Sequence, residues 1–202
     1  MGLLHSILFL VSFGILRTTP PANAADLVTF YAGSGRRWVL LAALYLIPLA
    51  AIAFIWFIVA LRVWVGAHGR PEQAFFSTVQ LVSGTVFIAI LLVAAAAFSI
   101  DAAVAEFTNA PLNTAQARLF PEYAKVIVVV LAMRIAAMFV IATSSIGRHA
   151  GLLPRWFIVV GYLVGAFLLL AASLNALLMI VLPVWMIVLC MLIVVRARRL
   201  PG

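Results

Sequence analysis

Long apolar runs separated by short polar connections dominate this chain. The runs cover residues 3–16, 39–61, 78–100, 126–146 and 157–195. One helical crossing of a bilayer takes about 20 apolar residues, so the last run is too long for a single span, and we divide it at residues 173–175 into a helical hairpin. The pattern predicts an all-α, polytopic transmembrane helix bundle of six spans, forming one integral membrane domain over residues 1–202.

The first run allows two interpretations. It is short, and Ala22-Asn23-Ala24 follows it, as in a secretory signal with a small-residue cleavage site. Its amino-terminal flank has no Lys or Arg, however, and this favours an uncleaved membrane helix. Cleavage would leave five spans in the same orientation.

The polar connection at residues 23–35 is long enough to hold a short helix. Leu27, Phe30 and Tyr31 would share one face of it, and the Gly-Ser-Gly sequence at residues 33–35 would end it. We expect this helix to lie in the headgroup region.

The connection at residues 101–125 is the longest polar segment and holds three of the five acidic residues. Asn113 or Thr114 can cap a short helix here. Because proline opposes helix continuation, we expect that helix to end at Pro121.

The composition excludes a water-soluble protein. Hydrophobic residues make up 67% of the chain and charged residues 9%, whereas soluble domains are about half apolar and about a quarter charged. The formal net charge is +8, but the basic residues lie at the ends of apolar runs, where such residues set orientation and contact anionic lipid headgroups. We therefore expect the lipid bilayer and its anionic headgroups as partners, and no nucleic acid.

The distribution of Lys and Arg predicts that both termini lie inside (N-in/C-in). With the amino terminus in the cytoplasm, seven basic residues flank the inner ends of the spans and five flank the outer ends, and such an excess marks the cytoplasmic side. The inner set is Arg62, Arg70, Arg148, Arg155, Arg196, Arg198 and Arg199, and the outer set is Arg17, Arg36, Arg37, Arg118 and Lys125. Because Lys125 is the only lysine and alanine is abundant, a composition typical of GC-rich bacterial genomes, the expected location is a bacterial plasma (inner) membrane.

Arg134 is the one basic residue inside a predicted span. A charge at the centre of a membrane helix costs at least about 2.5–3.5 kcal/mol, so we expect this side chain to face the bundle interior and to find a partner. The nearest acids are Asp101, at the outer end of the third span, and Glu106. Two interpretations fit this pattern. Under the first, Arg134 belongs to a substrate-anion or proton site in a polar cavity; under the second, it belongs to a buried ion pair that holds two helices together.

Small residues four positions apart mark two further helix surfaces. Gly161 and Gly165 begin the fifth span, and Ala132 and Ala136 flank Arg134. This spacing lets helix backbones approach closely. The contact can form within the chain, or with a membrane-protein partner or a second copy in a homo-oligomer.

Recognisable catalytic, cofactor and metal motifs are absent from the sequence. His5, His68 and His149 are too scattered for a metal site, and Cys190 lies alone in an apolar run. Glycine-rich nucleotide motifs, nucleophile motifs and paired carboxylates are also missing. We therefore expect no cofactor and no enzymatic activity.

The turn between the fourth and fifth runs carries a family resemblance. Gly151 is followed by Leu152-Leu153 and then by Pro154, Arg155 and Trp156, in an order in which proline can start a helix and arginine and tryptophan favour the membrane interface. Residues 138–164, with residues 26–62, resemble a group of actinobacterial multi-pass membrane proteins in which a G-x-L-P-R-W turn joins two spans. The resemblance implies a six-helix plasma-membrane protein and leaves its activity open.

Two functions are compatible with these features. The first is a non-enzymatic structural or accessory component of a membrane complex. The alternative is a small transporter or lipid-handling protein with a polar cavity around Arg134.

Overall fold

The computed structural model describes residues 1–17, 23–66, 72–108, 113–171, 175 and 177–197. These residues form helices and no strand, which confirms the all-α prediction. The elements are α1 (Gly2–Arg17), α2 (Ala24–Ala32), α3 (Gly35–Leu40), η1 (Leu41–Leu46), α4 (Ile47–Gly66), α5 (Glu72–Phe107), α6 (Gln116–Val126), η2 (Ile127–Ala132), α7 (Met133–His149), α8 (Arg155–Leu170) and α9 (Leu178–Ala197). The two η elements are single π-helical segments inside longer helices.

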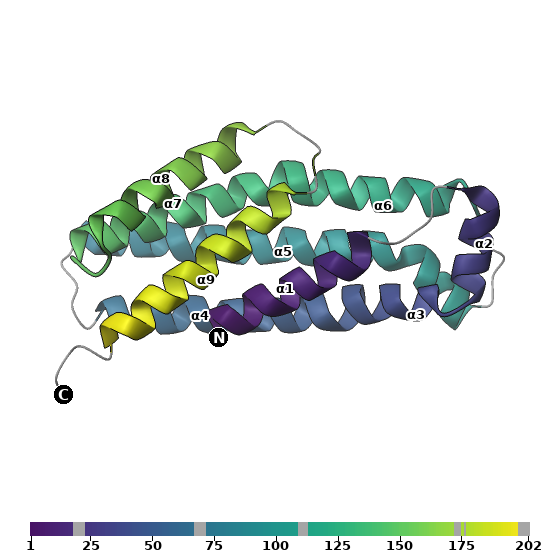
Figure 1. The fold of residues 1–202 in the computed structure, drawn as a ribbon, viewed down its shortest axis with the longest axis horizontal. Coiled ribbons are helices and arrows are strands. Elements are labelled where there is room, and N and C mark those ends of the chain that lie inside the picture. The colour runs from purple at the N-terminus through teal and green to yellow at the C-terminus, as the bar shows by residue number, and fades with distance from the viewer. Residues whose placement is uncertain (18–22, 67–71, 109–112, 172–174, 176, 198–202) are drawn as a thin grey trace.

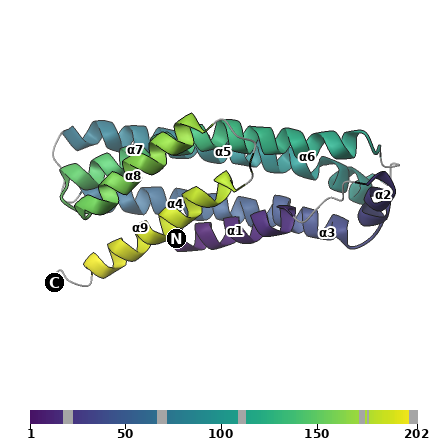
Figure 2. The ribbon, with the colours of Figure 1, turned by 45° about the horizontal axis from the view of Figure 1, so that its top comes forward.

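Three long helical rods run side by side, and shorter helices lie against them (Figure 1). The rods are α3–η1–α4, α5 and α6–η2–α7, with α5 in contact with both others. Helices α1, α8 and α9 cover only part of the rods' length (Figure 2). Beyond these three helices, at one end of the molecule, lie α2 and the α3 part of its rod. We call the end that carries α2 the α2 end.

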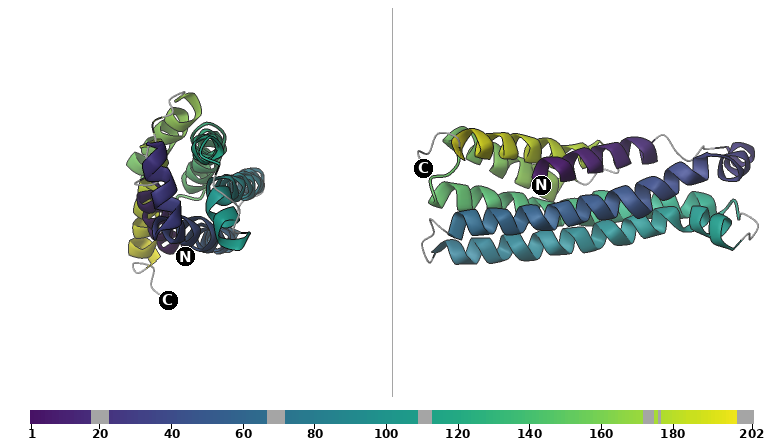
Figure 3. Two further views of the ribbon diagram at one scale, coloured as in Figure 1. Left: turned by 90° about the vertical axis from the view of Figure 1, so that its right-hand side faces the viewer. Right: turned by 90° about the horizontal axis from the view of Figure 1, so that it is seen from below.

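Five of the helices enclose a common interior. The helices form a closed ring in the order α4, α5, α7, α9 and α1, in which each packs against the next and α1 packs against α4. Helix α8 packs on the outside of this ring against α7. An end-on view shows this arrangement (Figure 3). Inside it, the ring of Phe54 lies 5.5 Å from that of Phe87 and 5.0 Å from that of Phe139.

Helix α2 covers a second, smaller core at its end of the molecule. Leu27 and Tyr31 are buried there against Val39, Leu40, Ala102 and Ala117, and Phe30 is half-buried beside them. The predicted helix and its apolar face are therefore confirmed. This apolar face packs against α3, α5 and α6 of the same chain.

Four helices are long and apolar enough to cross a membrane: Gly35–Val63, Ala74–Phe107, Gln116–His149 and Leu178–Arg196, among the residues described. The apolar helices Gly2–Arg17 and Arg155–Leu170 are shorter. At 1.5 Å per residue each spans about 24 Å, against about 30 Å of hydrocarbon. The structure thus shows apolar helices that suit a membrane, with four of spanning length.

The long polar connection at residues 101–125 is mostly helical. Helix α5 continues to Phe107, and α6 runs from Gln116 through Pro121 into α7, so the prediction that this helix ends at Pro121 is wrong. Asn113 Oδ1 accepts hydrogen bonds from the backbone nitrogens of Ala115 and Gln116 at 3.1 and 3.3 Å, in the turn that leads into α6. The residue directly before α6 is Ala115, which has no side-chain cap, so the Asn113 side chain acts from the turn before the cap position. Buried Pro121 removes one backbone donor, and the contacts of α6 with the neighbouring rod α5 outweigh that loss.

Other predicted helix ends agree with the structure. Pro154 is the residue immediately before α8, and α8 ends at Leu170 while α9 begins at Leu178, so the apolar run divides where we placed the break. Ser173 itself lies outside the described residues, as do His68, Arg70, Arg198 and Arg199.

Candidate functional site

Arg134 lies in α7 with its side chain half-buried. Its guanidinium donates a hydrogen bond to the carbonyl of Val130, one turn earlier in the same rod. The ion pairs found among the described residues join Arg36 to Glu106 and Lys125 to Glu122. The sequence had suggested Asp101 or Glu106 as the partner of Arg134, but the structure pairs Arg134 with neither.

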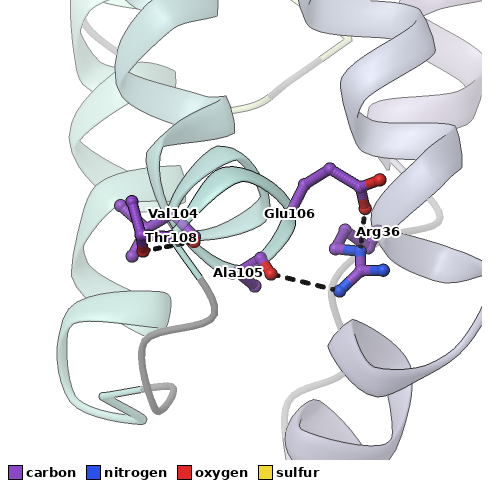
Figure 4. Close-up of polar contacts among 5 residues, drawn as sticks. All are labelled: Arg36, Val104, Ala105, Glu106 and Thr108. Atoms are coloured by element: carbon purple, nitrogen blue, oxygen red, sulfur yellow. Dashed lines mark hydrogen bonds and ion pairs between the residues drawn. The ribbon is translucent and has the colours of Figure 1, made fainter.

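Glu106 pairs instead with Arg36, from the start of the α3 rod (Figure 4). Arg36 Nε lies 2.6 Å from Glu106 Oε2, although its N–H is not aligned for a hydrogen bond. The same guanidinium donates to the carbonyl of Ala105 at 3.3 Å. These contacts hold α3 against the last turn of α5 at the α2 end.

The antiparallel register of α5 and the α6–α7 rod explains why Arg134 is left out. Gln80 Nε2 donates to Thr143 Oγ1 at 2.8 Å, and a Cβ on Gly84 would lie 3.4 Å from the Phe139 ring. Continuing this register places Asp101 level with Glu122, about 18 Å along the rod from Arg134 at 1.5 Å per residue.

Asp101 lies near Tyr31, where α2 covers α5. Both side chains are buried, and Asp101 Oδ2 and Tyr31 Oη have no hydrogen-bond partner among the described residues. Burial first, and then the nearby Asp101 carboxylate, raise the pKa of Tyr31 to about 12. The acid that we had assigned to an intramembrane pair thus belongs to the contact between α2 and α5.

The predicted small-residue surfaces pack within the chain. A Cβ on Gly161 would lie 2.0 Å from Ser144 Oγ, and one on Gly165 would lie 2.4 Å from Ile141 Cγ1, so α8 approaches α7 closely at both glycines. Ala132 and Ala136 are buried in the main core.

The turn residues lie at the end of the bundle opposite α2. Arg155 and Trp156 are exposed at the start of α8, where they are free to meet an interface. Gly151, with φ of 64°, adopts the left-handed conformation that ends α7.

A cavity of about 390 Å³ lies between α1, α5, α6 and α9, within the range of about 300–1,000 Å³ typical of small-molecule sites. Its charged lining residues are Arg17, Glu122 and Lys125, and Arg17 and Glu122 are exposed. They form the rim of the cavity.

Below the rim the cavity wall is apolar. It extends along α5 from Phe98 to Leu91, about 10 Å at the helical rise. The hydroxyl of Ser12, also in the wall, donates to the carbonyl of Leu8 at 2.7 Å. The cavity therefore combines a charged end with a wall whose polar group is satisfied within its own helix.

His5 supports the cavity at its deep end. Phe9 lines the cavity, and its ring lies 5.9 Å from that of His5, which lies 4.6 Å from Phe54. His5 Nδ1 is 2.8 Å from the carbonyl of Ala50, and it must be the donor because a carbonyl oxygen only accepts. This hydrogen bond fixes α1 on α4 just below Phe9.

Sequence reasoning missed the cavity and the role of His5. Two signals were available: a histidine inside the apolar run at residues 3–16, and four consecutive alanines at residues 94–97. Alanines facing phenylalanine and valine across a helix interface leave space, but only the packing shows whether that space is filled.

Among the described residues, no three His, Cys, Asp or Glu side chains come together where they could hold a metal ion. The arrangement is suited to binding a molecule with one polar and one apolar end. Comparison with family models, curated proteins and solved structures finds no match for this chain.

Proposed function

We propose that this chain is an integral protein of a bacterial plasma membrane, with six helices in the bilayer and both termini in the cytoplasm. Four apolar helices of spanning length support a membrane location. Helix α1 packs against α4 and α9, and α8 against α7, so the two shorter helices lie along spanning ones. Along the sequence, seven basic residues flank the predicted inner ends of the spans and five flank the outer ends, and this excess supports the orientation.

Within that membrane setting, we propose that the protein is non-enzymatic and handles lipid, binding an amphiphilic molecule in the cavity between α1, α5, α6 and α9. The observation that carries this proposal is the single charged rim above an apolar wall. Burying a chain of methylene groups contributes about 0.8 kcal/mol for each one removed from water, and the rim keeps a polar head hydrated. The proposal places the site near Lys125, away from Arg134.

An accessory role in a membrane complex stays a prediction beside this one. It requires a stable partner or a second copy, and isolation in mild detergent tests for either. The cavity favours lipid handling because a scaffold component needs no internal space with a charged rim.

The test is to fill the cavity from α5. Ala95 lines it and is buried, whereas the adjacent Ala96 is exposed on the same helix. We expect Ala95→Phe to lose lipid that the wild-type protein retains through purification, as measured by native mass spectrometry, and Ala96→Phe to retain it.

Val128→Phe, which fills the same space from the facing rod, should repeat the loss and separates blockage from misfolding. Circular dichroism confirms that each variant keeps its helices. Equal lipid retention by Ala95→Phe, Val128→Phe and wild type would refute the proposal.

A further inference from the structure

We infer that the amphiphile bound in this cavity is an anionic membrane lipid whose acidic head group binds Arg17. This inference rests on the proposed function, since it requires that the cavity holds an amphiphile. It adds the charge of the ligand, the residue that recognises it and the direction in which it lies.

The first step concerns the charges at the rim. Lys125 Nζ donates to Glu122 Oε1 and Oε2 at 2.7 and 2.8 Å, so these two residues neutralise each other. Arg17 lines the same rim and forms no ion pair with a described residue. The uncompensated charge that the structure shows at this rim is therefore positive and belongs to Arg17.

The second step concerns the chemistry that suits this charge. A guanidinium offers a planar set of N–H donors that matches a carboxylate or phosphate with two parallel hydrogen bonds. A lipid without net charge would leave the cation at the rim uncompensated. An acidic head group supplies the missing charge, and near an apolar wall such charge-assisted bonds are stronger than in water.

The third step concerns direction. The rim lies at the α2 end of the cavity, because Arg17 ends α1 and Glu122 and Lys125 lie in α6. The apolar wall continues from there toward Leu91 and Phe9. The head group therefore lies at the α2 end and the acyl chain points toward the centre of the bundle, as for a lipid of the leaflet at that end.

Arg17 has a second, ordinary explanation that the test must separate. A basic residue in the last turn of a helix interacts favourably with the helix dipole, and any basic residue at a membrane surface attracts anionic lipid weakly. Arg37 is a matched control, because it is exposed in α3 near the same end and does not line the cavity.

The experiment exchanges the purified full chain into nanodiscs of phosphatidylglycerol and phosphatidylcholine in equal amounts and measures retained lipid by native mass spectrometry. Both head groups offer a phosphate, but only phosphatidylglycerol brings a net negative charge to the cation at the rim. We therefore expect wild type and Arg37→Gln to prefer phosphatidylglycerol by about tenfold, and Arg17→Gln to lose most of that preference. Glu122→Gln releases Lys125 from its ion pair and should increase the preference.

The outcomes separate the inference from the function on which it rests. If wild type retains both lipids equally, or if Arg17→Gln and Arg37→Gln behave alike, the inference is wrong, while loss of all lipid in Ala95→Phe would still support an amphiphile site. If Ala95→Phe has no effect on either lipid, the proposed function itself is wrong. The inference is supported if Arg17→Gln loses the preference for phosphatidylglycerol, Arg37→Gln keeps it and Glu122→Gln increases it.

Discussion

At the residue scale, Arg134 and Arg36 show how register decides which charges meet. The sequence suggested Asp101 and Glu106 as partners for Arg134 and suggested none for Arg36. Arg36 lies at the same level as Glu106 and pairs with it at 2.6 Å. Arg134 lies about 18 Å along the rod from Asp101. Its guanidinium donates to the carbonyl of Val130 in its own rod, so one of its hydrogen-bond donors is satisfied within the same helix. Long side chains near apolar surface commonly do this while extending toward a polar region.

Double-mutant cycles should distinguish these two arginines. We expect the destabilisation caused by Arg134→Leu and Asp101→Leu to add within about 0.5 kcal/mol, because sites farther apart than about 7–10 Å rarely couple. Arg36→Leu and Glu106→Leu, which disrupt a partly exposed pair, should show a coupling of about 0.2–1 kcal/mol. Unfolding in mixed detergent micelles measures both cycles. A coupling above about 1 kcal/mol for Arg134 with Asp101 would contradict the register described above.

At the element scale, helices proved longer than the apolar runs that predicted them. The third and fourth runs cover residues 78–100 and 126–146, whereas the observed helices are α5 from Glu72 to Phe107 and a rod from Gln116 to His149. Hydropathy marks the part of a helix that lies in hydrocarbon. A helix continues into polar sequence when a neighbouring helix continues beside it, and α5 and α6 support each other in this way.

The contact between α7 and α8 depends on a backbone approach that hydropathy alone does not show. A Cβ on Gly165 would lie 2.4 Å from Ile141 Cγ1 and 3.3 Å from the carbonyl oxygen of Ala137, and the backbone carbonyl cannot move aside as a flexible side chain can. We expect Gly165→Val to destabilise the protein by about 1–3 kcal/mol, the usual cost of overpacking. Thermal unfolding in detergent measures the loss.

The neighbouring Ala166 provides the control for this prediction. It is exposed on the same turn of α8, so Ala166→Val should change stability by less than about 0.5 kcal/mol. Equal effects of the two substitutions would show that Gly165 does not face α7 in the membrane.

At the scale of the whole molecule, the two ends differ in build. The α2 end carries a helix across the bundle, a second small core and the ion pair of Arg36 with Glu106. The opposite end carries the exposed residues Arg155 and Trp156. The cavity opens near the first of these ends, so the proposed orientation places its rim on the outer side of the membrane.

Cysteine labelling tests that orientation. In a Cys190→Ala background, which removes the native buried thiol, we expect an impermeant maleimide to label Gln116→Cys in intact cells and to leave His149→Cys unlabelled, because these residues lie at opposite ends of one rod. A cytoplasmic reporter on the amino terminus should also be active if α1 crosses. Labelling of both cysteines after permeabilisation is the control, and the reverse pattern in intact cells would contradict the orientation.

Features that depend on local hydrophobicity and backbone chemistry could be predicted from the sequence. These are the apolar helices, the short helix with its buried Leu27 and Tyr31, the Asn113 turn before α6 and the helix start after Pro154. Each follows from residues within one or two helical turns of one another. The preference of a side chain for membrane over water, and its hydrogen bonds in caps and turns, act over that distance. They do not depend on which helix packs alongside.

The packing of the helices against one another determines which polar groups meet and where space remains. The partner of Glu106, the support of Phe9 by His5 and the cavity beneath Arg17 all join residues from different helices. A shift of one turn between two helices moves every such contact by about 5.4 Å while leaving the hydropathy pattern unchanged. Register and side-chain volume at helix interfaces therefore determine the candidate site, and neither can be read from the periodicity of a single helix.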